Sequence, residues 1–163
     1  MKPPISLLTL IVAQLLTTSA MADPVAVHIL LTPKEQMRFE FADGSKHFVL
    51  AVRREGKAEG SGVFAEANVT EFGWHDVNPP ISGDPHGYLQ ITTQNGDVAV
   101  LRWTVKAVFT KGEGTPTLVD HGFWELVSGT GQFVNKRGVG SLVIKPAGGP
   151  NLFMLEGEVA DKP

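Results

Sequence analysis

The chain has 163 residues, a formal net charge of −3, 18 glycines, 11 prolines and no cysteine. This length suits a single domain. Binding to nucleic-acid phosphates needs an excess of Lys and Arg, so we expect no nucleic-acid partner. Without cysteine, neither disulfide bonds nor thiolate metal sites are possible.

The first 22 residues have the pattern of a cleaved secretory signal peptide. Lys2 supplies a positive start, Ile5–Leu16 is mostly apolar, and residues 20–22 read Ala-Met-Ala, a small-x-small cleavage pattern. The alternative is a membrane anchor, but a membrane-spanning helix needs about 20 apolar residues, more than this run contains. We therefore expect cleavage between residues 22 and 23, a secreted or periplasmic protein, and no membrane span.

The remaining chain, Asp23–Pro163, is expected to form a single domain of strands and turns. Runs of β-branched and aromatic residues recur between clusters of Gly, Pro, Asn and Asp, which is typical of strands. In chain order these runs are Val25–Thr32, Gln36–Phe41, Lys46–Arg54, Val63–Trp74, Tyr88–Thr93, Val98–Thr110, Leu118–Ser128, Gly138–Lys145 and Leu152–Val159. A polar turn is expected at Gly56–Gly62, a long loop at His75–Gly87 and, at most, a short helical turn at Asn135–Arg137.

About eight strands at near-regular spacing with short turns predict an all-β, mostly antiparallel fold. A sheet must hide its edges, and closure into a barrel does so completely. We therefore predict an eight-stranded antiparallel up-and-down barrel, whose interior is just wide enough to be filled by side chains or to hold one small ligand. A two-sheet sandwich is the structural alternative.

A glycine-rich motif stands near the end of the chain, where residues 122–140 read GFWELVSGTGQFVNKRGVG. Its glycines permit positive φ angles or a close approach of two backbones. The phenylalanine can pin the loop under one end of the barrel. We predict a structural role for the motif residues Gly129, Thr130, Gly131, Phe133, Gly138 and Gly140.

The Gly-Thr-Gly-x-Phe stretch and the Arg-Gly strand start that follows it resemble the allene oxide cyclase and dirigent-protein superfamily. The resemblance implies a calycin-like eight-stranded barrel, often trimeric, with a largely apolar cavity. In the plant relatives this cavity guides cyclisation of an unstable epoxide or coupling of phenoxy radicals, without a covalent nucleophile. The implied function is an exported barrel that holds a small apolar or aromatic guest and, if it is an enzyme, steers an isomerisation or cyclisation.

Two other functions remain open beside this one. The first is a non-catalytic carrier or sensor of a hydrophobic small molecule, and the second is a structural trimeric barrel. An interior carboxylate that converges with an Arg or Tyr favours chemistry, whereas an all-apolar lining favours carriage. Whether the protein is an enzyme is therefore left undecided by the sequence.

Two glutamates fall inside otherwise apolar strands and are the candidate catalytic residues. Glu125 shares a strand face with Phe123, and Glu156 shares one with Met154. A carboxylate on an apolar barrel wall has a raised pKa and can serve as a general acid or base. A structural or surface role is the alternative for each.

Four residues are candidates for ligand binding. Trp103 lies in the middle of the longest apolar strand face and is expected inside the barrel. Arg53 lies on a predicted hairpin, with Glu40 and His47, and points either outward or into a polar end of the cavity. The four candidates are Trp103, Phe123, Arg53 and Tyr88.

Two His and two Asp gather around the long loop that follows Trp74. Such a set is compatible with Zn²⁺ or Fe²⁺, but prolines and a glycine separate its two halves. A turn-rich loop at the barrel mouth is the interpretation that we favour, so we expect no metal and no cofactor. The residues concerned are His75, Asp76, Asp84 and His86.

Overall fold

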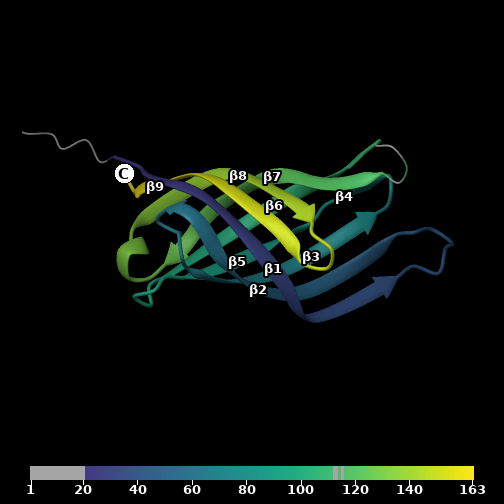
Figure 1. Cartoon of the computed structure of the whole chain (residues 1–163), viewed down its shortest axis with the longest axis horizontal. Coiled ribbons are helices and arrows are strands. Elements are labelled where there is room, and N and C mark those ends of the chain that lie inside the picture. Colours follow the sequence, from purple (N-terminus) through teal and green to yellow (C-terminus); the bar gives the residue numbers. More distant parts are fainter. Residues whose placement is uncertain (1–20, 112–113, 115) are drawn as a thin grey trace, which may run out of the picture.

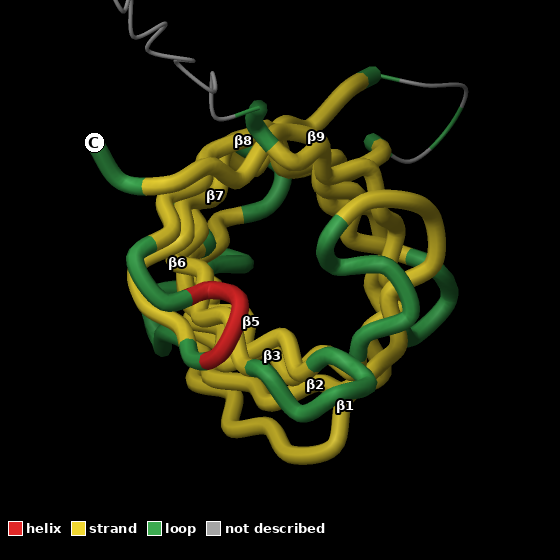
Figure 2. The backbone as a smooth tube through the Cα atoms, turned by 90° about the vertical axis from the view of Figure 1, so that its left-hand side faces the viewer, coloured by secondary structure: helices red, strands yellow, loops and turns green. Residues whose placement is uncertain are grey.

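The computed structural model describes residues 21–111, 114 and 116–163. Most of the predicted signal peptide therefore lies outside the described residues. The described chain forms a closed barrel of antiparallel strands, seen from the side in Figure 1 and from one end in Figure 2. In this part of the chain, no helix has the length and apolarity needed to cross a membrane.

Eight strands make the barrel wall, and a ninth, very short strand pairs with the end of one of them, β3. The strands are β1 (Asp23–Glu40), β2 (Phe48–Gly62), β3 (Asn68–Asn78), β4 (Ser82–Gly83), β5 (His86–Thr92), β6 (Val98–Thr110), β7 (Thr117–Gly129), β8 (Lys136–Pro146) and β9 (Asn151–Asp161). Around the wall the order is β1-β2-β3-β5-β6-β7-β8-β9, and β9 pairs with β1 to close the ring. The predicted eight-stranded antiparallel barrel is confirmed.

The first two predicted strands are one strand. β1 runs through Pro33, with a shift in its register against β2 between Pro33 and Glu35. Proline lacks an N–H, but a strand tolerates it at a bulge. Only the first half of β1, up to Leu31, pairs with β9. The second half continues with β2 as a hairpin that projects beyond the rest of the wall (Figure 1).

The predicted polar turn at Gly56–Gly62 is also wrong, because β2 continues to Gly62. Gly56 and Gly60 face backbone carbonyls of β1 so closely that a Cβ atom at either position would collide with them. These glycines therefore mark a close approach of two strands and not a turn. In the same way β3 extends to Asn78, into the predicted long loop. The only helical turn of the described residues is Gly131–Phe133, not Asn135–Arg137.

The inner faces of the strands form one apolar core. Side chains alternate between the two faces of a strand, so every second residue points inward. Among the fully buried side chains are Ile29, Leu31, Leu101, Trp103, Leu142, Phe153 and Leu155. The expectation that Trp103 lies inside the barrel is thus confirmed.

Aromatic side chains close one end of the barrel. Phe64, from the β2–β3 connection, and Phe133, from the helical turn, are both buried with ring centroids 5.7 Å apart. Trp124 of β7 lies beneath them, 5.9 Å from the Phe64 ring. Figure 2 shows the helical turn, in red, at the rim of this end. Phe133 therefore lies under this end of the barrel, where the sequence analysis placed it.

The remaining motif residues hold this closed end in place. The Thr130 hydroxyl accepts a hydrogen bond of 2.9 Å from the Val98 amide, and Gly131 has φ +51°. Gly140 lies directly against the Trp124 indole, where a Cβ atom would be only 2.6 Å from Nε1. The glycines are therefore required by the shape of the closed end, as the sequence predicted.

Removing either aromatic side chain from the closed end should destabilise the barrel. We expect Phe64→Ala and Phe133→Ala each to lower the free energy of unfolding by about 3–5 kcal/mol, because each leaves a cavity among buried rings. Chemical denaturation followed by far-UV circular dichroism measures this. Phe39→Ala is the matched control, because Phe39 is exposed and should change stability by less than about 0.5 kcal/mol. Equal effects at all three positions would contradict the role of the closed end.

Candidate functional site

Four ionisable side chains lie inside the barrel and form a buried polar cluster. They come from three strands, with Arg54 on β2, Glu71 and His75 on β3, and Asp120 on β7, and none is more than 5% exposed. Charged groups are rarely buried unless they are paired, because leaving water costs several kcal/mol for each ion. The pairing within the cluster therefore decides what it can do.

An ion pair between neighbouring strands is the centre of the cluster. Arg54 Nη1 donates a hydrogen bond of 2.6 Å to Glu71 Oε2, and the two residues are directly opposite each other in the β2–β3 register. His75 Nε2 lies 3.2 Å from Glu71 Oε1 and 3.1 Å from Arg54 Nη1. Gly73, between the two β3 residues, leaves the space for this contact, because a Cβ atom there would be 2.7 Å from His75 Nε2.

Asp120 is the most perturbed acid of the cluster. Burial raises the pKa of its carboxyl group to about 6, against a smaller opposing effect of the positive charge on Arg54. Within the described residues, Asp120 Oδ1, Arg54 Nε and Trp103 Nε1 have no hydrogen-bond partner. Each such buried atom costs about 1–3 kcal/mol, so this arrangement is not the most stable one for a barrel core. A carboxyl group with a pKa near neutrality can both give and take a proton.

The predicted catalytic glutamates do not belong to this cluster. Trp124 takes the inward position on β7, so Glu125 lies on the outer face and forms an ion pair with Arg102. Glu156 is exposed on the outer face of β9, next to the inward-pointing Leu155. The prediction that they stand on the apolar inner wall is wrong. Apolar residues occupy both faces of these strands, so the alternation alone did not reveal the inner face.

The residues considered as metal ligands are divided between the two faces of the wall. His75 points into the barrel, whereas Asp76 points outward and its Oδ1 lies 2.6 Å from His47 Nε2. His86 Nδ1 donates a hydrogen bond of 3.1 Å to the Asp84 carbonyl, and the Asp84 side chain pairs with Lys106. Over residues 21–111, 114 and 116–163 there is no group of three or more side chains suited to hold a metal ion.

Two hollows lie side by side on the outer face of the barrel, and together we call them the aromatic hollow. The first, of about 570 Å³, extends over β1, β2, β3 and β5, and the second, of about 280 Å³, extends over β5, β6 and β7. They share His86, Gly87 and Tyr88. Large apolar side chains line both, and the main ones are Met37, Phe72, Trp74, Tyr88 and Phe123.

Strand register brings these side chains together. Trp74 is opposite His86, His86 is opposite Thr104, and Thr104 is opposite Phe123. In the adjacent outer row, Phe72 is opposite Tyr88. Phe72, Trp74, Tyr88 and Phe123 are each between 44% and 52% exposed. Contiguous exposed apolar surface of this kind usually marks a binding or interaction site.

Three of the four predicted ligand-binding residues, Arg53, Tyr88 and Phe123, present their side chains to the aromatic hollow, whereas the Trp103 side chain is buried inside the barrel beneath it. Arg53 and Tyr88 line its first part, and Tyr88 and Phe123 line its second part. The sequence analysis expected a guest in an interior cavity and left open whether Arg53 points outward, whereas the hollow lies outside the wall. It missed Phe72 and Trp74, although their alternation on β3 was a detectable signal.

The arginines at the hollow are already neutralised. Arg53 donates a hydrogen bond of 2.9 Å to Glu35 and also pairs with Glu55. Both contacts raise the pKa of its guanidinium group. Arg102, at the other end, pairs with Glu125. The hollow therefore presents aromatic surface between two groups of paired charges, Arg53 with two glutamates at one end and Arg102 with one glutamate at the other.

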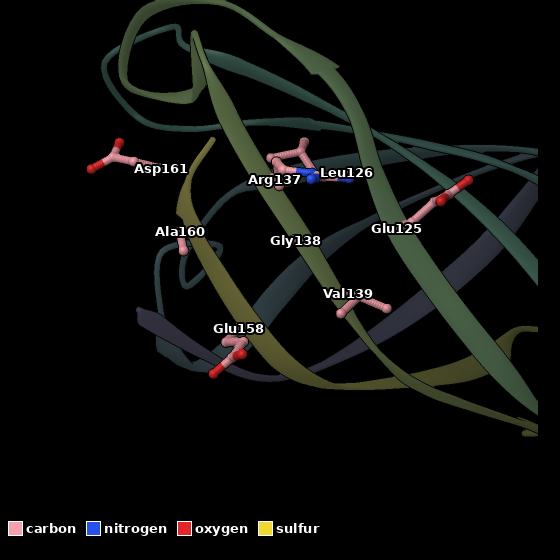
Figure 3. A pocket seen from close by; sticks show the side chains of 8 residues that line it. All are labelled: Glu125, Leu126, Arg137, Gly138, Val139, Glu158, Ala160 and Asp161. Carbon is pink, nitrogen blue, oxygen red and sulfur yellow. The ribbon is translucent and has the colours of Figure 1, made fainter. Parts of the chain in front are cut away.

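A third hollow, of about 340 Å³, lies over β7, β8 and β9 (Figure 3). Arg137 lines it together with three carboxylates, those of Glu125, Glu158 and Asp161. The figure shows these carboxylates on different sides of the hollow, without a common point toward which they converge. A catalytic site needs reactive side chains that converge on one place. This hollow is therefore a weaker candidate for the functional site than the aromatic hollow.

Comparison with solved structures supports the fold. A protein of unknown function from Clostridium acetobutylicum ATCC 824 is similar, with a TM-score of 0.55 and 12% identity over 84% of this chain and 98% of its own. A beta-barrel-like protein from Acinetobacter baumannii AYE is similar with a TM-score of 0.52 and 12% identity, over 89% of this chain and 99% of its own. No family model and no curated protein matches the chain. At these identities, the two structures bear on the fold alone.

The pKa of Asp120 makes stability depend on pH. Because the folded value of about 6 lies above the ordinary 3.8, the stabilising effect of the protonated form is complete below about pH 4 and is lost as the pH rises through 6. We expect Asp120→Asn to unfold less readily than wild type at about pH 8, by up to about 3 kcal/mol. The gap should largely close at about pH 4. Urea titrations at both pH values measure the difference.

The control for this experiment is Asp84→Asn. It removes an exposed carboxylate whose ion pair with Lys106 contributes at most about 1 kcal/mol, and it should leave the pH dependence unchanged. If Asp120→Asn and wild type differ by the same amount at both pH values, the raised pKa of Asp120 is refuted.

Proposed function

We propose that this protein is a binding barrel that holds a small apolar or aromatic guest in the aromatic hollow, without chemical conversion. The observation that carries the proposal is the gathering of exposed aromatic side chains from β3, β5 and β7 around two adjoining hollows that share His86, Gly87 and Tyr88. Burying apolar surface contributes about 25 cal/mol per Å², so covering these rings with a guest is favourable. Aromatic linings with a few polar groups are typical of small-molecule sites.

The floor of the hollow supports this proposal. Gly73 and Gly87 are opposite each other in the β3–β5 register, between Phe72 and Trp74 on one strand and His86 and Tyr88 on the next. Both glycines are tightly packed, because a Cβ atom at Gly87 would collide with the Phe72 carbonyl. The side chains beside them therefore stand on a fixed backbone, which lowers the entropy cost of binding a guest.

We further propose that the protein is an exported relative of the allene oxide cyclase and dirigent proteins, and a homotrimer. The glycine motif and the eight-stranded barrel support the relationship. Support for export comes from the position of β1, which begins at Asp23, so that cleavage after Ala22 would leave every wall strand complete. Intact mass of the protein recovered from the periplasm tests the cleavage, and sedimentation equilibrium tests the trimer.

Isomerisation or cyclisation is the second candidate function, and one observation favours it. The buried polar cluster places Arg54 near the Asp120 carboxyl group, whose pKa is raised to about 6 by burial. An interior carboxylate near an arginine is the feature that favours chemistry over carriage. A catalytic role requires a guest inside the barrel beside Asp120 and not in the aromatic hollow, and it predicts that Asp120→Asn abolishes turnover of that guest while its affinity is kept. If the protein is a carrier, there is no turnover, and Asp120→Asn leaves the affinity for the guest unchanged.

The binding proposal predicts a specific effect of Tyr88, which both parts of the hollow share. We expect the neutral dye N-phenyl-1-naphthylamine to bind wild type, and Tyr88→Ala to weaken this binding about tenfold, because a buried aromatic contact contributes about 1.5–3 kcal/mol. Dye fluorescence gives the affinity, and native mass spectrometry of the purified protein reveals co-purified guests. Phe39→Ala, an exposed aromatic outside the hollow, should bind the dye like wild type.

Two results would refute binding in this hollow. One is the absence of both dye binding and any co-purified guest. The other is an equal loss of affinity in Tyr88→Ala and Phe39→Ala, since binding would then follow exposed aromatic surface in general.

A further inference from the structure

We infer that the guest of the aromatic hollow is an elongated, uncharged molecule with two ring-sized parts, one in each part of the hollow. The inference rests on the proposed binding function and adds the class of molecule to it. Three features of the described residues lead to this class. They are the distance between the two ends of the hollow, the charge at each end, and the polar atoms between them.

The distance comes from strand register. Trp74 and Phe123 lie in the same outer row, separated by the steps from β3 to β5, β5 to β6 and β6 to β7. Adjacent strands are about 4.8 Å apart, so these two side chains start from backbones roughly 14 Å apart. A single six-membered ring cannot contact both. A guest that uses both parts of the hollow must therefore be elongated along the row and cross Tyr88 and His86, which the two parts share.

The charge comes from the ion pairs at the two ends. Arg53 is held by Glu35 and Glu55 at the first end, and Arg102 is held by Glu125 at the second. A guest with a carboxylate would have to displace a glutamate from one of these groups, and a cationic guest would compete with Arg53 or Arg102 for their glutamates. An uncharged guest leaves both pairs intact. Charge complementarity therefore favours a neutral molecule.

The polar atoms between the two ends can orient such a guest. His86 donates a hydrogen bond from Nδ1 to the Asp84 carbonyl, so in the neutral imidazole ring Nε2 is left as an acceptor. Thr104 lies next to His86 in the same row. A hydroxyl or amide group between the two rings of the guest, or on one of them, matches these partners. The class is thus a neutral two-ring compound with a hydrogen-bond donor.

Three probes on one scaffold test the inference by isothermal titration calorimetry with the full-length protein. They are 4-(2-phenylethyl)phenol, which has two rings, 4-ethylphenol, which has one, and 4-(2-phenylethyl)benzoate, which carries a charge. We expect the two-ring phenol to bind at least tenfold more tightly than 4-ethylphenol. We also expect it to bind more tightly than the benzoate.

Variants at each end assign the two parts of the hollow. In Trp74→Ala and in Phe123→Ala, the affinity ratio between the two-ring phenol and 4-ethylphenol should fall toward one, because only one part still holds a ring. Phe39→Ala is the matched control, with an exposed aromatic that lies outside the hollow, and it should keep the wild-type ratio. Circular dichroism verifies that each variant is folded, as expected for changes at exposed positions.

The outcomes separate this inference from the proposed function. If none of the three probes binds and no guest co-purifies, the binding function fails and the inference fails with it. If probes bind but the one-ring and two-ring phenols have equal affinity, or the ratio persists in Phe123→Ala, the two-part guest is refuted while binding stands. Tighter binding of the benzoate would refute the uncharged class.

Discussion

The pairing of the first strand with the last is the constraint on which the structure depends. β1 and β9 pair from Asp23 with Val159 to Leu31 with Asn151, and this contact joins residues from opposite ends of the described chain. All other wall strands pair with their neighbours in sequence through hairpin connections. No disulfide bond supports the closure, because the chain has no cysteine. The apolar core that the closed wall surrounds must therefore provide the stability.

Closure also separates the side chains of the wall into an inner and an outer face, which differ in composition. The inner face holds the core, the aromatic side chains of the closed end and the buried polar cluster. The outer face carries the aromatic hollow, with Phe72 and Trp74 on β3 and Tyr88 on β5. Since alternate residues of one strand point to opposite faces, β3 supplies both Glu71 of the cluster and Phe72 of the hollow. The two candidate sites are therefore separated by only one layer of backbone.

The buried cluster and the aromatic hollow differ in what they contribute. In the cluster, the ion pair of Arg54 and Glu71 is costly to break, because removing one partner leaves an unpaired buried charge. The cluster thus links β2 to β3. It also contains Asp120, whose raised pKa makes it the candidate for a catalytic role. In the hollow, the charges are paired at the surface, and the aromatic rings provide the apolar contact area. The proposed binding of a neutral guest rests on this outer surface.

The amino-acid sequence by itself determined the all-β fold, the antiparallel barrel and the structural role of the glycine motif. These three properties follow from local sequence patterns, because the alternation of apolar residues and the turn residues each involve only a few positions. Phe133 belongs to the loop of the glycine motif, so its place at the barrel end also follows from a short stretch of sequence. Sequence also selected Trp103, Phe123, Arg53 and Tyr88 as candidates for ligand binding, but it expected the guest in an interior cavity and did not decide which way Arg53 points.

Only the tertiary structure decided which face of each strand points inward. β7 has apolar residues on both faces, so its alternation could not tell whether Trp124 or Glu125 faces the core, and Glu125 was wrongly expected inside. The buried cluster was not predicted either. Its members Arg54, Glu71 and Asp120 are far apart in sequence, and the sequence does not distinguish them from ordinary surface charges. Curvature and register bring them together, and both properties arise only when the ring of strands closes.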